Sequence, residues 1–158
     1  MELDDIDKRI LGILQVDATQ SIQEIADDVG LTTNPCWRRI KRLEDSGVIT
    51  GRIATINWAK LGLSMTAFAR IHTTQHSKDW LSTFKKSVNQ IPEIVECHRM
   101  TGEVDYLLKI VVRDLAHYDL VYQRLIKLVP SLSDVSSAFS MELLKSEHRM
   151  DLTASGAS

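Results

Sequence analysis

The chain has 158 residues, of which 44% are hydrophobic and 25% are charged, and its formal net charge is −2. These are ordinary globular proportions, so they exclude a wholly disordered chain, and the nearly neutral charge argues against indiscriminate binding to nucleic acid. No basic leader and no run of about 20 apolar residues is present, so we expect neither export nor membrane insertion. Two cysteines, Cys36 and Cys97, are too few for a disulfide framework and suit a reducing cytoplasm.

The first part of the chain has the pattern of short amphipathic helices. Apolar residues recur at helical spacing over residues 4–17, which predicts a first helix. Ser21 and Glu24 have the spacing of a capping box, which predicts that a second helix begins there. Gly30 is placed to end this second helix.

A third helix is expected to begin between Thr32 and Pro35, where a hydroxyl can cap it, and to end at Gly47. Its inward face is predicted to consist of Trp37, Ile40 and Leu43, with Cys36 beside them. Residues 48–49 and 52–53 are expected to pair as a small β-ribbon. Three short helices followed by a ribbon indicate a winged helix-turn-helix domain.

The third helix also carries a cluster of basic and polar side chains. Because the N-terminal residues of a recognition helix meet base edges, base contacts are predicted for Thr32, Thr33, Asn34 and Arg38. Phosphate contacts are predicted for Arg39, Lys41, Arg42 and the ribbon residue Arg52. The alternative is a solvated helix face on which Lys41 pairs with Glu44 or Asp45. The winged-helix context favours DNA.

The second part of the chain alternates between strand and helix periods. A linker with a turn of helix is expected at residues 57–62, followed by strands at 65–72, 94–100, 104–112 and 135–143, and by helices at 80–91 and 114–129. The order βαββαβ predicts a ferredoxin-like arrangement with both helices on one face of the sheet. The other face then requires a partner subunit to cover it.

The predicted fold class is therefore α+β, with a winged helix-turn-helix followed by a ferredoxin-like βαββαβ sandwich. The expected domains are a DNA-binding domain over residues 1–56, a linker over 57–63, a ligand-sensing and oligomerisation domain over 64–148, and a flexible tail over 149–158.

The predicted turn at residues 99–105 has groups that suit an amino acid. Gly102 lets backbone amides approach a ligand, and Arg99 would attract its carboxylate. Asp105 would accept hydrogen bonds from an α-ammonium group. The alternative is an ordinary hairpin in which Arg99 and Asp105 pair across the strands, and the residues alone favour it.

Three segments resemble the Lrp/AsnC family of leucine-responsive and related regulators: LTTNPCWRRIKRLEDSGVI, RMTGEVDYLLKI and PSLSDVSSAFSMELLK. The resemblance implies that the ferredoxin-like domain is the family's regulation of amino-acid metabolism (RAM) module. It also implies an effector site between neighbouring dimers, formed by Arg99, Met100, Thr101, Gly102, Asp105, Ala138 and Ser140. The combination of TTNPCWRRIKRLEDSG with RMTGEVDYL is similar to regulators that respond to cysteine.

The sequence therefore predicts a cytoplasmic, sequence-specific DNA-binding regulator that responds to a small amino acid. Its expected partners are double-stranded DNA, the amino acid and further copies of the chain, which the resemblance implies assemble from dimers towards octamers. No metal-ligand spacing, phosphate loop or nucleophile motif is present, so no enzyme activity, cofactor or metal is expected. The alternatives are a nucleoid-type architectural protein without an effector and, more remotely, a small ferredoxin-like enzyme.

Overall fold

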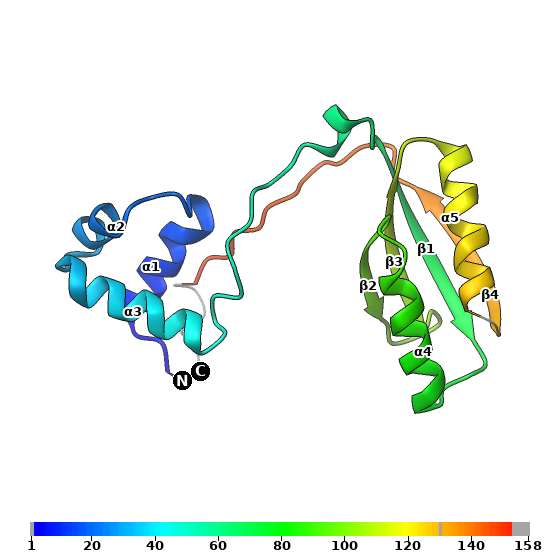
Figure 1. Cartoon of the computed structure of the whole chain (residues 1–158), viewed down its shortest axis with the longest axis horizontal. Coiled ribbons are helices and arrows are strands. Elements are labelled where there is room, and N and C mark those ends of the chain that lie inside the picture. The colour runs from blue at the N-terminus through cyan, green and yellow to red at the C-terminus, as the bar shows by residue number, and fades with distance from the viewer. Residues whose placement is uncertain (1, 130, 153–158) are drawn as a thin grey trace. The chain divides into compact units, whose positions relative to one another are not determined.

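The structure is a computed structural model that describes residues 2–129 and 131–152 (Figure 1). The chain forms two compact units. The first unit contains the residues up to Thr55 together with those from Lys145 onward, and the second contains Ile56–Leu144. The last described residues are therefore part of the same compact unit as the first ones.

Three helices build the first unit: α1 (Asp5–Val16), α2 (Ile22–Val29) and α3 (Thr33–Asp45). The predicted capping box of α2 is confirmed, because Ser21 accepts from the Glu24 N–H while Glu24 accepts from the Ser21 N–H. Gly30 ends α2 in the left-handed conformation, with a φ of 75°, where a glycine carries no steric cost. The three predicted helices are confirmed.

The small β-ribbon predicted after the third helix is wrong, because residues 46–57 contain no strand. The chain instead folds back on α3, where the Ile49 N–H donates to the Leu43 carbonyl over 3.0 Å. Ile53 is 88% exposed, so no apolar contact holds a second strand in place. A ribbon of two-residue strands with nothing packed on it is too short to be stable.

The second unit has the predicted βαββαβ order. Its elements are a 3₁₀ turn η1 (Trp58–Leu61), β1 (Met65–Thr73), α4 (Lys78–Asn89), β2 (Ile94–Arg99), β3 (Tyr106–Val112), α5 (Leu115–Leu128) and β4 (Leu132–Phe139). The four strands form one antiparallel sheet in the order β2-β3-β1-β4. The predicted ferredoxin-like arrangement is confirmed.

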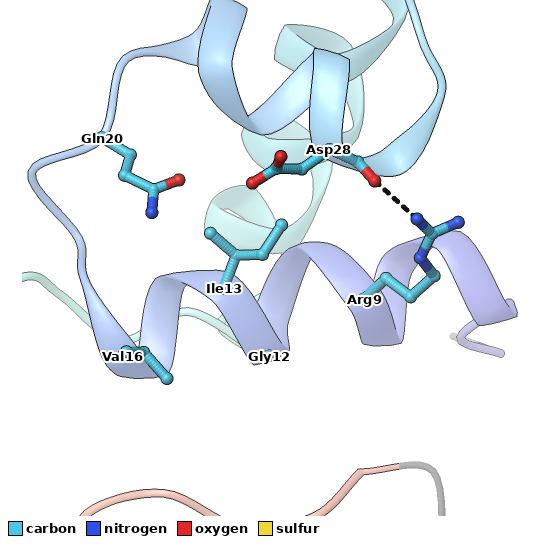
Figure 2. Close-up of a pocket in the computed structure, with 6 residues that line it drawn as sticks. All are labelled: Arg9, Gly12, Ile13, Val16, Gln20 and Asp28. Carbon is cyan, nitrogen blue, oxygen red and sulfur yellow. Dashed lines mark hydrogen bonds between the residues drawn. The ribbon is translucent and has the colours of Figure 1, made fainter.

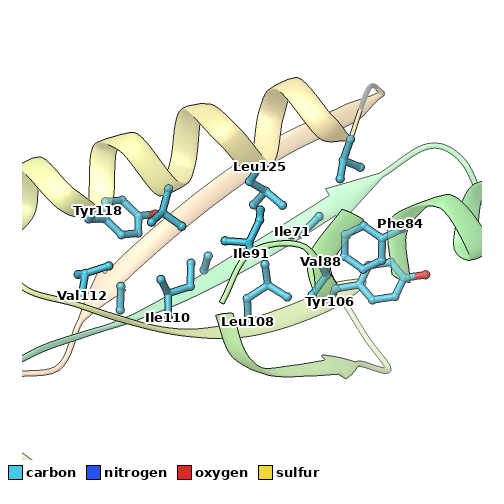
Figure 3. Close-up of a cluster of buried hydrophobic side chains, with 14 residues drawn as sticks. Ile71, Phe84, Val88, Ile91, Tyr106, Leu108, Ile110, Val112, Tyr118 and Leu125 are labelled. Carbon is cyan, nitrogen blue, oxygen red and sulfur yellow. The ribbon is translucent and has the colours of Figure 1, made fainter. Parts of the chain in front are cut away.

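Both helices of this unit pack on one face of the sheet (Figure 3). The core contains Phe84 and Val88 from α4, Tyr118 and Leu125 from α5, and alternate residues of β1 and β3. In β1, for example, Ala67 and Ala69 are buried, whereas Phe68 and Arg70, which alternate with them, are exposed. We call the side of the sheet that carries Phe68 and Arg70 the open face. Neither of the two helices of this unit, α4 and α5, contributes to it.

The last segment of the described chain returns to the first unit. The Met150 N–H donates to Gln15 Oε1 over 2.9 Å, and Gln15 Nε2 donates to the Met150 carbonyl over 3.3 Å. Leu152 packs against the apolar core of the helices. The strand predicted over 135–143 ends earlier, at Phe139, and part of the predicted flexible tail, residues 153–158, lies outside the described residues.

Among the described residues, no helix is long and apolar enough to cross a membrane.

Candidate DNA interface and effector site

The packing of α3 determines which of its side chains face outward. Its buried side consists of residues three or four apart: Cys36, Ile40 and Leu43. A second row at the same spacing is exposed and consists of Asn34, Trp37, Arg38 and Lys41. We call this second row the outward face of α3. It combines amide, aromatic and cationic groups, which are the chemical groups that contact base edges and phosphates.

The prediction that Trp37 faces inward is wrong. Trp37 is 50% exposed, whereas its neighbour Cys36 is completely buried. Adjacent residues of an α-helix point about 100° apart, so only one of the two can lie on a narrow buried stripe. The small thiol fits there, since a free cysteine behaves as a small apolar residue. Trp37 is therefore a candidate DNA contact that the sequence reasoning missed, although its spacing from Asn34 and Lys41 was the available signal.

Arg39 and Arg42 contact α1 in this structure. Arg39 Nη1 lies 2.6 Å from Asp4 Oδ2 and 2.8 Å from Asp7 Oδ1, and Arg42 also forms an ion pair with Asp7. The Asp7 side chain is only 1% exposed. The Asp7 N–H and the Arg39 guanidinium both bind the Asp4 carboxylate, so they hold its pKa below the ordinary value. The two arginines thus join α3 to α1, and their predicted phosphate contacts stay predictions.

The other cations of this region differ in how firmly they are held. Lys41 Nζ lies 2.8 Å from Asp45 Oδ1, which is the helical pair that the solvated-face alternative anticipated, and Arg52 lies 2.9 Å from Glu44. Such exposed pairs contribute only about 0.2–1 kcal/mol, so a phosphate can compete for these cations. Within the described chain, no hydrogen bond or ion pair holds Arg38. Its guanidinium is therefore available for the predicted base contact.

The two threonines at the start of α3 have different surroundings. Thr32 occupies the N-cap position, but its hydroxyl makes no capping hydrogen bond, contrary to the prediction that a hydroxyl caps this helix. The Thr33 hydroxyl donates to Gln23 Oε1 and so ties α3 to α2. Thr32 therefore keeps an unused hydroxyl at the end of the helix that would enter a groove.

The predicted effector turn is a tight hairpin between β2 and β3. The Met100 N–H donates to the Asp105 carbonyl over 2.8 Å, and Gly102 has a φ of 97°, which favours glycine. Asp105 Oδ2 accepts a hydrogen bond from the Thr73 N–H over 2.8 Å, so one oxygen of this carboxylate is already bonded to the backbone of β1. No ion pair joins Arg99 to Asp105 in the described part of the chain, so the alternative of a cross-strand charge pair is not what forms this hairpin.

The remaining predicted effector residues lie at the opposite edge of the sheet. Ala138 is in β4, and Ser140 follows that strand, whereas Arg99 ends β2. Three strand spacings separate the two edges, which amounts to about 14 Å. One copy of the chain therefore does not bring Arg99 and Ala138 together.

The pockets of the two units overlap little with the predicted sites. A pocket of about 470 Å³ lies beside α1 and is lined by Arg9, Gly12, Ile13, Val16, Gln20 and Asp28, with Arg9 bound to the Asp28 carbonyl (Figure 2). Another, of about 660 Å³, lies between α5 and β4. Neither contains a predicted site residue. A pocket of about 330 Å³ between α4 and β2 includes Arg99.

The described residues contain no cluster of histidine, cysteine and acidic side chains that could hold a metal ion. Burial raises the pKa of both thiols, Cys36 and Cys97, and the positive charge of Lys85 partly opposes this effect at Cys97. Both cysteines are therefore poorly suited to act as nucleophiles.

Comparison with known proteins agrees with this division into two units. A family model described as a winged helix-turn-helix DNA-binding domain matches residues 3–50, and one described as the Lrp/AsnC ligand binding domain matches residues 66–150. The second match alone spans more than half of the chain. The chain belongs to the Lrp/AsnC family.

Two curated Lrp/AsnC relatives match along nearly the whole chain. The DNA-binding transcriptional activator DecR of Escherichia coli strain K12 is 48% identical over 143 residues, covering 90% of this chain and 94% of the relative. The glutamate uptake regulatory protein of Zymomonas mobilis is 46% identical over 144 residues, covering 91% and 87%. These relatives are regulators and not enzymes, so the chain is a DNA-binding transcriptional regulator.

Solved structures of Lrp/AsnC proteins have the same fold. An AsnC family regulator from Agrobacterium tumefaciens is 44% identical, with a TM-score of 0.91 over 97% of this chain and 99% of that one. A transcriptional regulator from Neisseria meningitidis, solved as an L-Met complex, is 29% identical, with a TM-score of 0.89 over 97% and 99%. Together with the family model, this similarity identifies the second unit as an amino acid-binding domain.

Proposed function

We propose that this Lrp/AsnC regulator reads DNA with the outward face of α3 and that a small amino acid, with cysteine as the first candidate, changes its DNA binding and assembly. The observation that supports the DNA half most strongly is the exposed row Asn34, Trp37, Arg38 and Lys41 beside a packed helix-turn-helix. We propose that the regulator acts in the cytoplasm, the compartment that contains the DNA it binds.

Within that row, the roles differ by position. Arg38 and Asn34 lie in the first half of α3, so we assign them base contacts together with Thr32 and Thr33. Trp37 adds an apolar surface that suits a thymine methyl group or a sugar. Lys41 lies further along the helix and Arg52 beyond it, and both suit phosphates. Arg39 and Arg42 would act mainly by holding α3 against α1.

The effector half of the proposal requires an assembly. Arg99 with the Gly102 turn and Ala138 with Ser140 lie at opposite edges of one sheet. These groups form a single site only where the edge of one copy meets the opposite edge of another. An amino acid bound there would change how copies associate, and therefore how their DNA-binding units are spaced. Dimers joined through the open face, assembling further towards octamers, provide this geometry.

DNA binding is tested by fluorescence anisotropy of the purified chain on DNA from upstream of its own gene. Replacing Arg38→Ala should weaken specific binding about tenfold, because a bidentate base contact contributes about 1–3 kcal/mol. Replacing Lys41→Ala should reduce the magnitude of the slope of log affinity against log salt by about 0.9, as expected for one phosphate contact.

The matched control is Lys127→Ala, which removes a cation from α5 and should leave both quantities unchanged. If Arg38→Ala and Lys127→Ala bind this DNA equally well, the proposed DNA interface is wrong.

A further inference from the structure

The pocket between α4 and the edge strand β2 contains no residue of the DNA interface and shares only Arg99 with the proposed effector site. Its volume is about 330 Å³, which lies at the small end of the range for ligand pockets. Both of its walls come from one copy of the chain. A ligand held there would not need a second subunit.

The floor of this pocket is aromatic and rigid. Phe84 and Tyr106 are almost fully buried, and their ring centroids lie 4.5 Å apart (Figure 3). Trp80 stacks on Phe84 at 5.1 Å with an interplanar angle of 8°. Leu81 extends the same apolar surface. A ligand with an apolar chain would therefore meet a preformed surface and pay little entropy to order it.

Two cations border this apolar floor. Lys85 comes from α4 and Arg99 from β2. Arg99 is paired in register with Tyr106, whose buried side chain faces the helices, so both residues lie on the helix side of the sheet. No ion pair neutralises Lys85 or Arg99 within residues 2–129 and 131–152.

No carboxylate lines the pocket. The nearest acidic residue of β2, Glu96, alternates to the open face, where it binds Lys109 over 2.7 Å and His98 over 3.3 Å. A carboxylate ligand would therefore find two unpaired cations, whereas an α-ammonium group would meet the same two like charges and no carboxylate to balance its own charge.

We propose that this pocket binds a small monocarboxylate with an apolar chain and no amino group, such as a 2-oxo acid, in preference to the corresponding amino acid. The carboxylate lies between Lys85 and Arg99, and the apolar chain lies on Phe84 and Tyr106. The site goes beyond the proposed amino acid effector site, with which it shares only Arg99. Because a 2-oxo acid is what remains when an amino acid loses its amino group by transamination, the regulator would register both sides of that reaction.

The test uses the full chain and isothermal titration calorimetry, with 4-methyl-2-oxopentanoate and leucine as matched probes that differ only in the oxo and amino groups. We expect the oxo acid to bind at least about tenfold more tightly than leucine at this pocket, which corresponds to about 1.4 kcal/mol. Its binding should shift the indole N–H resonance of Trp80, which stacks on the pocket floor.

Two variants locate the site. Lys85→Gln should weaken binding of the oxo acid about tenfold. Lys86→Gln removes the neighbouring exposed cation, which does not line the pocket, and should leave the affinity unchanged. If leucine also binds but is indifferent to Lys85→Gln, the two sites are separate, as proposed. Failure of the oxo acid to bind at millimolar concentration, equal losses in both lysine variants, or equal and Lys85-dependent binding of leucine would overturn the proposal.

Discussion

Asp7 is the one charged residue that is fully buried in the described chain, and its surroundings explain why it can be. Arg39 and Arg42 approach its two carboxylate oxygens from α3. A buried carboxylate is costly unless it is paired and hydrogen-bonded, and here both conditions are met. This buried carboxylate of α1 therefore fixes the position of the helix that we propose reads DNA.

Replacing Asp7→Asn should lower the free energy of unfolding by about 1–3 kcal/mol, because two arginines lose their shared partner but remain partly exposed to water. Urea denaturation followed by circular dichroism measures this change. The control is Asp5→Asn, whose carboxylate is 97% exposed and 3.9 Å from Lys8, and it should cost less than about 0.5 kcal/mol. Equal effects of the two substitutions would show that the buried pair contributes nothing.

The acidic caps of the first unit predict a loss of stability in acid. The pKa of Asp4 is lowered by the Asp7 N–H and by Arg39, and that of Glu24 by the Ser21 N–H. Because these folded-state values lie below the unfolded ones, the carboxylates stabilise the fold above about pH 4 and lose this contribution as the pH falls through the folded-state values. We expect unfolding free energy to decline below about pH 4, and Asp4→Asn to flatten that decline. A pH profile that is the same for the variant and the original chain would contradict this assignment.

At the scale of single residues, the sequence indicated which residues belong to α3 and its basic cluster, but not which way each side chain points. Cys36 and Trp37 are adjacent and both apolar enough for a core, but the structure buries Cys36 and leaves Trp37 half exposed. Likewise, Arg38 and Arg39 are indistinguishable in a basic cluster. The structure separates them because Arg39 lies within reach of two carboxylates from residues that are distant in the sequence.

Among the elements, helices and strands with strong periodicity were predictable, because each buries a repeating apolar face against its own unit. The attachment of the C-terminal segment, the described residues from Lys145 onward, was not predictable. The segment has no regular hydrogen-bonding period, and its attachment includes the Gln15 side-chain amide, which pairs with the Met150 backbone, and Leu152, which packs on the helix core. Nothing in the local sequence around Met150 indicates a partner on α1.

This attachment predicts protection from proteolysis. Lys145 and Arg149 are the trypsin sites next to Met150. Gln15→Ala removes both hydrogen bonds, so cleavage after these two residues should become several-fold faster under native conditions, since the segment opens more often. Mass spectrometry of timed digests measures the rates. The control Gln123→Ala removes a comparable exposed amide from α5 and should leave cleavage unchanged; if the Gln15 variant behaves like it, the attachment is not significant.

On the scale of the whole molecule, the open face of the sheet is the surface that the helices of its own unit leave uncovered. The order βαββαβ predicted that both helices would cover one side, and this is confirmed. Phe68 remains 37% exposed on the other side, between cationic and polar neighbours. How copies meet across this face could not be predicted from periodicity, because the pattern of one strand specifies which side is apolar but not which partner covers it.

Replacing Phe68→Glu should convert dimers into monomers, because it places a charge at the centre of the proposed contact. Analytical ultracentrifugation reports the mass directly. The control Leu120→Glu changes an equally apolar residue on the exposed side of α5 and should preserve the dimer. A dimer in both variants would mean that another surface joins the copies.

Amino acid control of DNA binding is tested most directly by titrating single amino acids, cysteine and leucine first, into the complex of the full chain with its own upstream DNA. One amino acid should change the DNA affinity by at least about fivefold, because coupling between sites is typically about 1–3 kcal/mol. The sedimenting mass of the same sample should change with it. A specific complex that no amino acid alters would contradict the effector half and favour an architectural role. Absence of any complex at low salt would contradict the DNA-binding role of α3.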